Sequence, residues 1–119
     1  MVREKDEIFS ETKPAPFNGN GEITVRSLLK GEEEMYYGGR VFAHTTVYPG
    51  SRIGYHVHQN ESETYYILSG SGRYNDNGTM VDVHPGDVFF CGAGEGHGIE
   101  ATDAPIEMIA LILYKDKKK

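Results

Sequence analysis

The chain of 119 residues has one cysteine, no tryptophan and no long apolar run. A single thiol, Cys91, excludes an intrachain disulfide and is more often a small buried hydrophobic residue than a nucleophile or a metal ligand. No apolar run approaches the ~18 residues that cross a bilayer, and residues 1–7 lack the apolar stretch of a secretory signal. We therefore expect a cytoplasmic protein that has no membrane partner.

Positive charge is also scarce. The chain has 12 Lys and Arg residues against 18 Asp and Glu residues, which gives a net charge of −6, and its basic run is confined to residues 115–119. Because binding to phosphate groups needs a basic face, we expect no nucleic-acid partner. With 38% hydrophobic and 25% charged residues, the sequence is typical of one soluble globular domain.

Strand signals dominate what is present. Short segments rich in β-branched and aromatic residues are separated by turn residues, and they cover 41–47, 55–58, 63–68, 81–83, 87–90 and 106–113. The segment 75–78 reads Asn-Asp-Asn-Gly, and Asn-Gly favours the type I′ turn of a β-hairpin. Helical periodicity is ambiguous at 27–35 and unconvincing elsewhere. This pattern, with 15 glycines and 5 prolines, predicts an all-β sandwich or antiparallel barrel.

The N-terminal residues differ from the rest of the chain. Pro14 and Pro16 break any helix there, so we expect residues 1–22 to form an irregular or extended arm. The compact barrel domain is expected over residues 23–119. Such an arm could pack along the domain or across a dimer.

Four side chains form a candidate metal site: His56, His58, Glu63 and His97. On a strand, residues i and i+2 point to the same face, so His56 and His58 project together. Glu63 follows a polar turn at the start of an apolar strand, where a returning hairpin can place its carboxylate beside both imidazoles. Glu61 is the alternative carboxylate, although we expect it to lie within the turn. His97 is the fourth candidate ligand, and glycines at 92, 94, 96 and 98 suit a backbone held tightly near a site.

Three imidazoles and one carboxylate suit one divalent transition metal ion, which could be Fe, Mn, Ni, Co, Cu or Zn. Without a thiolate ligand, a closed structural zinc site is disfavoured. Four protein ligands would leave two positions of a six-coordinate ion for water or substrate.

The spacing of these residues resembles the cupin superfamily, whose first motif is Gly-x5-His-x-His-x3,4-Glu-x6-Gly. The sequence matches this motif fully, at Gly50, His56, His58, Glu63 and Gly70. The second motif, Gly-x5-Pro-x-Gly-x2-His-x3-Asn, is matched at Gly86, Gly94 and His97, while Gly92 replaces the proline and Ala101 the asparagine. The missing proline is expected to loosen the turn before His97. The resemblance implies a cupin-type antiparallel β-barrel (double-stranded β-helix or jelly roll) of six to eight strands, with the metal inside near one mouth.

The resemblance leaves three functions open. One is a metalloenzyme acting on a small polar molecule such as a sugar or carbonyl compound, as an isomerase, epimerase or lyase. The second is an Fe(II)-dependent dioxygenase, and the third a non-catalytic barrel that binds or senses a small ligand. Small cupins of this type are often called mannose-6-phosphate isomerase-like, but the sequence offers no phosphate cradle beyond an arginine. Cupins also commonly form dimers, so a homodimer is expected.

Tyr65 is the candidate catalytic residue, because strand alternation places it on the same face as Glu63. In cupin-type dimethylsulfoniopropionate lyases, a tyrosine two residues after the metal-binding glutamate is thought to act as a general acid or base. The same spacing occurs in cupins without this activity, so an ordinary lining tyrosine is the alternative. Further candidates for lining a substrate pocket are Tyr55, Ile67, Arg73 and Phe89.

Overall fold

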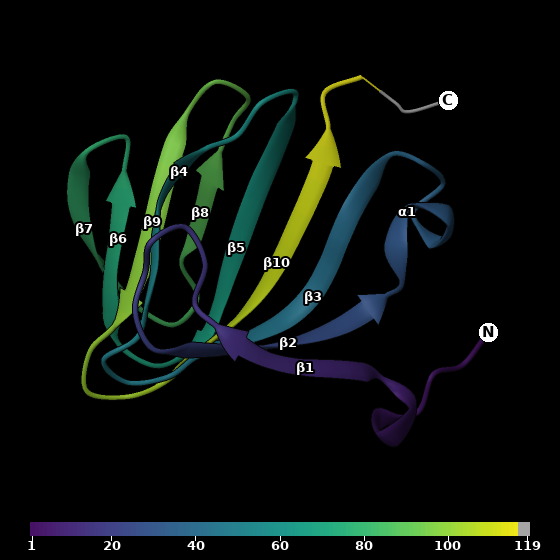
Figure 1. Cartoon of the computed structure of the whole chain (residues 1–119), viewed down its shortest axis with the longest axis horizontal. Coiled ribbons are helices and arrows are strands. Elements are labelled where there is room, and N and C mark those ends of the chain that lie inside the picture. The colour runs from purple at the N-terminus through teal and green to yellow at the C-terminus, as the bar shows by residue number, and fades with distance from the viewer. Residues whose placement is uncertain (117–119) are drawn as a thin grey trace.

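A computed structural model describes residues 1–116 of the chain, so the last three residues of the basic tail lie outside the description. Ten β-strands dominate the described part, with only a short 3-10 turn and one short helix beside them (Figure 1). The elements in chain order are η1 (Lys5–Glu7), β1 (Phe9–Pro14), β2 (Glu22–Leu29), α1 (Gly31–Glu34), β3 (Gly39–Val47), β4 (Arg52–Val57), β5 (Glu61–Ser69), β6 (Gly72–Asp76), β7 (Thr79–Val83), β8 (Val88–Cys91), β9 (Gly96–Ala101) and β10 (Ile106–Tyr114).

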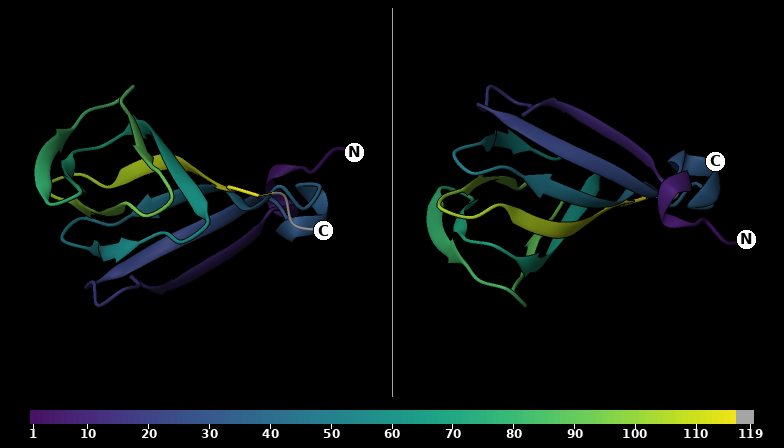
Figure 2. Two further views of the ribbon diagram at one scale, coloured as in Figure 1. Left: turned by 90° about the horizontal axis from the view of Figure 1, so that it is seen from above. Right: turned by 90° about the horizontal axis from the view of Figure 1, so that it is seen from below.

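The strands form two antiparallel sheets. A six-stranded sheet has the order β1-β2-β3-β10-β5-β8, and a four-stranded sheet has the order β4-β9-β6-β7. Figure 2 shows the two sheets wrapped around a common interior. This architecture confirms the predicted all-β, double-stranded β-helix fold. The described strands outnumber the expected six to eight, because β1 and β2 extend the larger sheet.

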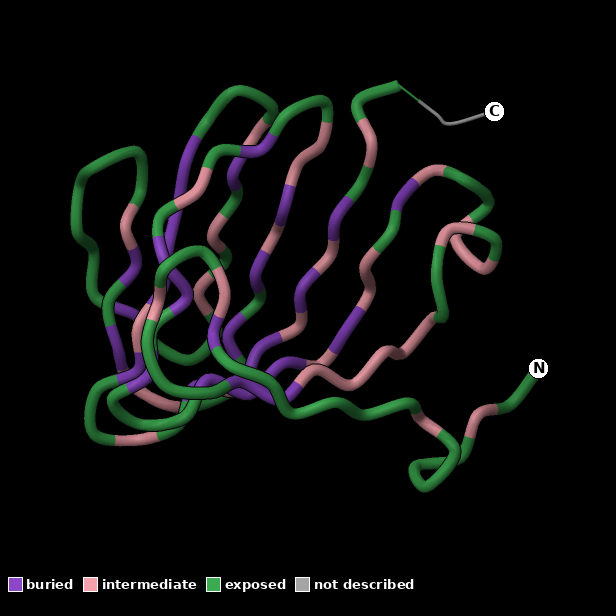
Figure 3. Tube along the Cα trace, in the orientation of Figure 1, coloured by how far each residue is buried: buried purple, intermediate pink, exposed green. Residues whose placement is uncertain are grey.

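The interior is filled by alternate residues of the central strands. Along β10, Ile106, Met108, Ala110 and Ile112 are buried, while the residues between them are only partly covered. The buried positions lie on the central strands of both sheets, and the N-terminal segment is largely exposed (Figure 3). Each fully buried Ile or Met side chain contributes about 1.5–3 kcal/mol relative to an exposed one. The alternation of apolar and polar residues therefore favours the strand conformation, and it also places the apolar side chains in the core between the sheets.

The predicted hairpin is confirmed. Asp76 pairs with Thr79 across β6 and β7, and Asn77 and Gly78 form the connection with φ angles of 50° and 97°. Two consecutive positive φ angles define a type I′ turn, which Asn-Gly tolerates best. The hairpin places β6 against β9, so Tyr74 of β6 faces the barrel interior.

The segments that the sequence left ambiguous take up mixed structure. Residues 27–29 complete β2, and only residues 31–34 form the helix α1. Within the expected arm, residues 9–14 form β1 and pair with β2 throughout. Cys91 is a buried free thiol, as expected. No helix among residues 1–116 is long and apolar enough to span a membrane.

Candidate metal centre

The four predicted ligands meet inside the barrel, with one ligand atom from each lying within 4.8 Å of the others. The closest atoms are almost equidistant. Nε2 of His58 lies 3.1 Å from Oε1 of Glu63, Nε2 of His97 lies 3.0 Å from the same oxygen, and the two Nε2 atoms are 3.0 Å apart. His58, Glu63 and His97 are buried, and His56 is partly buried.

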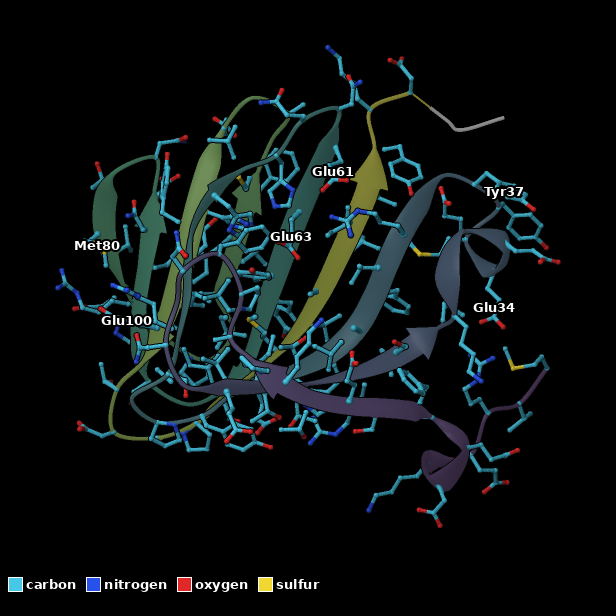
Figure 4. All side chains as sticks on the ribbon, viewed as in Figure 1. Glu34, Tyr37, Glu61, Glu63, Met80 and Glu100 are labelled. Atoms are coloured by element: carbon cyan, nitrogen blue, oxygen red, sulfur yellow. The ribbon has the colours of Figure 1, made fainter. Side chains whose placement is uncertain are left out.

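The two sheets supply different kinds of ligand. His56 of β4 pairs directly with His97 of β9, and His58 follows the end of β4, so the imidazoles come from the side of the four-stranded sheet. Glu63 comes from β5 of the opposite sheet, and Figure 4 shows it farther along that strand than Glu61. The site therefore forms only where the inner faces of the two sheets meet. Strand alternation determines which side chains of each sheet lie on that inner face.

Each imidazole is held in place through its Nδ1 atom. Nδ1 of His56 lies 2.8 Å from the carbonyl oxygen of Gly54, and Nδ1 of His58 lies 2.6 Å from Oε2 of Glu61. Nδ1 of His97 lies 2.9 Å from the hydroxyl oxygen of Tyr74. Contacts of this kind orient the rings of metal-binding histidines and set their tautomers. They leave all three Nε2 atoms available to the centre.

The electrostatics of the site favour an ionised carboxylate beside imidazoles. Burial raises the pKa of Glu63, but hydrogen bonds with His58 and His97 outweigh it and lower the pKa to about 2. The hydrogen bond with Glu63 raises the pKa of His58. Burial lowers the pKa of His56, which keeps that imidazole neutral and its lone pair free.

The spacing of the donor atoms fits a transition metal ion. Metal–nitrogen and metal–oxygen bonds to such ions are about 2.1 Å long, so neighbouring ligand atoms of an octahedral complex are about 3.0 Å apart. The three separations among His58, Glu63 and His97 match this value closely. Nitrogen and carboxylate donors without a thiolate suit Fe, Mn, Ni, Co, Cu or Zn. The arrangement can therefore hold one divalent ion.

Three of the four candidate ligands, His56, His58 and Glu63, line a cavity of about 250 Å³. Its walls are mostly apolar, and they include Ile23, Val25, Val41, Met108, Ala110 and Ile112. Five further lining residues carry a charge, a hydroxyl group or an aromatic ring that could contact a ligand: Lys13, Phe17, Arg40, Thr45 and Tyr65. The residues 13 and 17 belong to the segment that the sequence suggested to be an arm.

Tyr65 faces the cavity, as strand alternation predicts. It is buried with Glu63 and Ile67, whereas Tyr66 and Leu68 on the other face are 47% and 44% exposed. Its ring stacks on that of His97, with 5.1 Å between the centroids. Burial raises the pKa of the Tyr65 phenol well above 10, and the nearby charge of Glu63 adds to this effect. The phenol is therefore a proton donor at neutral pH and not a base.

The other pocket candidates lie elsewhere. Ile67 is buried in the core and does not line the metal cavity. Phe89 packs against that core and stacks on Tyr74, with 4.3 Å between the ring centroids. Both side chains therefore pack in or against the core and do not line the space that a bound molecule would occupy.

Tyr55 and Arg73 line a different hollow, of about 380 Å³, on the outer side of the four-stranded sheet. Tyr55 precedes His56 on β4 and therefore points to the opposite face, where its ring lies over the backbone of Gly96. Arg73 precedes the buried Tyr74 on β6, so its side chain likewise points to the outer face of the sheet. The expectation that they share the metal cavity is thus not met. Met80 and Glu100, which line the same hollow, lie over the four-stranded sheet in Figure 4.

The turn before His97 is closed without proline. The backbone N–H of Gly92 donates to Oε1 of Glu95 at 2.6 Å, and the N–H of Glu95 donates to the carbonyl oxygen of Gly92 at 3.0 Å. These two bonds fix the turn from both sides. The loosening expected from the missing proline is therefore compensated by the side chain of Glu95.

A comparison with protein families matches residues 43–112 to the cupin domain family. This range holds all four candidate ligands and more than half of the chain. The chain therefore belongs to the cupin domain family.

Two of the similar proteins come from Thermotoga maritima. The chain is 40% identical to an oxalate-binding protein of this organism over 114 residues, which cover 95% of this chain and 93% of the relative. The crystal structure of a predicted oxalate decarboxylase from Thermotoga maritima is also 40% identical, with a TM-score of 0.89, and the match covers 96% of this chain and 99% of that one.

A more distant structure shares the fold alone. It is an uncharacterised protein with a double-stranded β-helix domain from Klebsiella pneumoniae, 22% identical with a TM-score of 0.68. The match covers 88% of this chain and 86% of that one.

Proposed function

We propose that the chain binds a small dicarboxylate of the oxalate class at a divalent metal ion held by His56, His58, Glu63 and His97. The charge of the metal cavity carries this proposal. Apart from the candidate ligands, the charged side chains among the described lining residues are Lys13 and Arg40, and both are cations. The chain as a whole is acidic, with a net charge of −6, so the cavity differs from the average surface.

The size of the cavity agrees with a ligand of few atoms. Pockets for drug-sized molecules hold about 300–1,000 Å³, whereas the metal cavity holds about 250 Å³. The name of the Thermotoga maritima relative, an oxalate-binding protein, points to the same class of ligand. A divalent ion bound here would supply Lewis acid positions for carboxylate oxygens.

The chain's own residues would complete the recognition of the anion. Lys13 and Arg40 come from β1 and β3 of the six-stranded sheet. Lys13 would attract and orient a carboxylate of the ligand, whereas Arg40 is already bonded to both carboxylate oxygens of Glu61, which offsets much of its charge. The apolar walls exclude water and strengthen these charge interactions. Tyr65 would donate a hydrogen bond from its protonated phenol.

The enzymatic alternatives differ in whether a side chain must take a proton from the substrate or donate one to it. An isomerase or epimerase needs a group that takes up a proton from the substrate, and Tyr65 does not serve because its pKa is raised well above 10. A decarboxylating lyase needs only a proton donor, since cleavage of oxalate gives carbon dioxide and a carbon atom that must be protonated to yield formate. The protonated phenol of Tyr65 is a weak acid, but the carbon atom left by decarboxylation is a much stronger base and would take its proton, after which the tyrosinate would regain a proton from water. A metal-dependent lyase is therefore our second candidate. The Fe(II) dioxygenase stays a prediction from the family resemblance.

Binding and turnover can be tested on the same metal-loaded protein. Calorimetric titration with oxalate is expected to give saturable binding, while acetate binds much more weakly and His58→Ala binds neither metal nor oxalate. At a free oxalate concentration of 100 times Kd, the free energy of unfolding should rise by about 2.7 kcal/mol. Absence of oxalate binding by the metal-loaded protein would overturn the proposal.

The lyase is tested by incubation with 13C-labelled oxalate and detection of formate. Formate production that is lost in Tyr65→Phe, with oxalate affinity retained, would support catalysis. Binding without any product would leave a binding protein.

A further inference from the structure

We propose that Phe17 limits the size of the ligand that the metal cavity accepts, because it separates that cavity from the hollow outside the four-stranded sheet. The ligand class rests on the proposed function, whereas the separation of the two spaces rests on geometry alone. Phe17 belongs to the connection between β1 and β2, residues 15–21, which we call the β1–β2 loop.

The β1–β2 loop runs along the free edge of β4. The N–H of Gly54 donates to the carbonyl oxygen of Pro16 at 3.0 Å. Asn20 and Arg52 exchange two backbone hydrogen bonds, of 3.1 and 2.8 Å. In Figure 1 the loop passes in front of the four-stranded sheet, and Figure 2 places it at the border between the two sheets. The loop thus joins an edge of the smaller sheet to the β1–β2 end of the larger one.

Two glycines permit this close approach. A Cβ atom on Gly54 would lie 1.8 Å from the carbonyl oxygen of Phe17, and a Cβ on Gly19 would lie 1.8 Å from the carbonyl oxygen of Arg52. Either side chain would push the loop away from β4, because both contacts are with backbone atoms. The close approach therefore depends on one glycine in the loop, Gly19, and one in β4, Gly54.

The ring of Phe17 covers a candidate metal ligand. It stacks on the imidazole of His56, with 3.8 Å between the centroids and 11° between the planes. The backbone of Phe17 has a φ angle of 62°, in the left-handed region that bulky residues rarely adopt. Residues held in such conformations cost free energy and cluster at functional sites. Here the residue with this backbone conformation is the one whose ring lies on His56.

Phe17 and Ile53 are the residues that line both spaces, the metal cavity of about 250 Å³ and the outer hollow of about 380 Å³. Ile53 is fixed within β4 and is buried. Phe17 lies on a loop, and 54% of its surface is exposed. Removing its ring would open the metal cavity toward the outer hollow and make room for longer ligands.

The test uses Phe17→Gly, which removes the ring and also relieves the strain at a positive φ angle. Phe17→Tyr keeps the ring, and Phe9→Ala is a matched control because Phe9 is 55% exposed and lines neither space. The proteins are loaded with Co(II), and azide and imidazole are titrated by visible absorption. Phe17→Gly should bind imidazole about tenfold more tightly than the wild type, with azide affinity nearly unchanged.

The same proteins are then titrated with oxalate and glutarate. In Phe17→Gly the affinity for glutarate should rise about tenfold relative to oxalate, while Phe17→Tyr and Phe9→Ala keep the wild-type ratio. Gly19→Ala, which displaces the loop without changing Phe17, should shift both ratios in the same direction. Thermal unfolding of each variant verifies that the barrel remains folded.

The outcomes separate this inference from the proposed function. If imidazole and glutarate gain no more than azide and oxalate in Phe17→Gly, Phe17 does not limit ligand size, even where oxalate binds well. If no dicarboxylate binds to any variant while imidazole still distinguishes them, the proposed function fails and the role of Phe17 stands.

Discussion

Nδ1 of His58 lies 2.6 Å from Oε2 of Glu61, and Arg40 donates to both oxygens of that carboxylate at 2.9 Å. A carboxylate beside Nδ1 keeps the proton on that nitrogen and leaves Nε2 as the ligand atom. Arg40 in turn lowers the pKa of Glu61, which keeps the carboxylate ionised. Glu61 is therefore not a competing ligand, as the sequence allowed, but the residue that positions His58.

We expect Glu61→Ala to weaken metal binding about 10- to 100-fold, as is typical when the partner of a metal-binding histidine is lost. Glu61→Gln should have a smaller effect because its amide oxygen can still accept the hydrogen bond from Nδ1. Metal affinity is measured by competition with a chromophoric chelator. The control is Glu33→Gln, on α1. Wild-type affinity in Glu61→Ala would contradict the assigned role.

Tyr74 should matter for both stability and metal binding. Its hydroxyl group lies 2.9 Å from Nδ1 of His97, and both side chains are almost fully buried. In Tyr74→Phe this nitrogen loses its partner in the interior, which should lower the free energy of unfolding by about 1–3 kcal/mol. Metal affinity should fall about tenfold, at the weaker end of such effects.

Urea unfolding and chelator competition measure these two effects of Tyr74→Phe. Tyr48→Phe is the matched control, because it also loses a hydrogen bond, 2.6 Å long and to Thr24, but at a partly exposed position. Equal losses of metal affinity in the two variants would show that the bond to His97 has no special role.

Lys13 and Arg40 should have separable effects. Lys13→Met removes a cation from the cavity without touching a metal ligand, so oxalate affinity should fall about tenfold while metal affinity is unchanged. Arg40→Met should weaken both, because Arg40 also holds Glu61. Calorimetric titrations with metal and then with oxalate distinguish the two patterns, and Lys30→Met serves as the control. Unchanged oxalate affinity in Lys13→Met would remove Lys13 from the anion site.

Much of the fold could be predicted from residue patterns close together in sequence. The strand over 106–113 has clear alternation, and the turn at Asn77-Gly78 requires positive φ angles that these residues tolerate. The strand β9 was not predicted, because its sequence holds two glycines, which disfavour strands intrinsically. It is held by pairing with neighbours, since β9 lies between β4 and β6. The strands β1 and β2 were not predicted either, and they pair with each other along their length.

The candidate site was predictable where its residues follow a spaced motif, as do His56, His58, Glu63 and His97. Its supporting contacts were not, because they join residues far apart in the chain. Tyr74 meets His97 across a pair of strands, and Phe17 reaches His56 only through the path of the β1–β2 loop. The homodimer, which a single chain does not test, stays a prediction.

The acid stability of the metal-free protein should depend on Glu63. Its folded pKa is lowered from 4.5 to about 2 by hydrogen bonds with His58 and His97, against the opposing effect of burial. Below pH 4.5 the unfolded chain binds a proton at Glu63 that the folded protein does not, so stability falls as the pH drops toward 2. The loss from this group should be on the order of 3 kcal/mol.

Urea unfolding in the presence of a chelator, at several pH values between 2 and 6, measures this loss. Glu63→Gln should be less stable at pH 6 but should lose less stability on acidification, because the amide does not titrate. His56 and His58 influence the wild type near neutral pH in opposite directions, since their pKa values are lowered and raised respectively. The comparison is therefore made below pH 4.5. Parallel acid curves for Glu63→Gln and the wild type would show that the buried carboxylate is not ionised in the metal-free protein, and would remove the electrostatic basis of the preformed site.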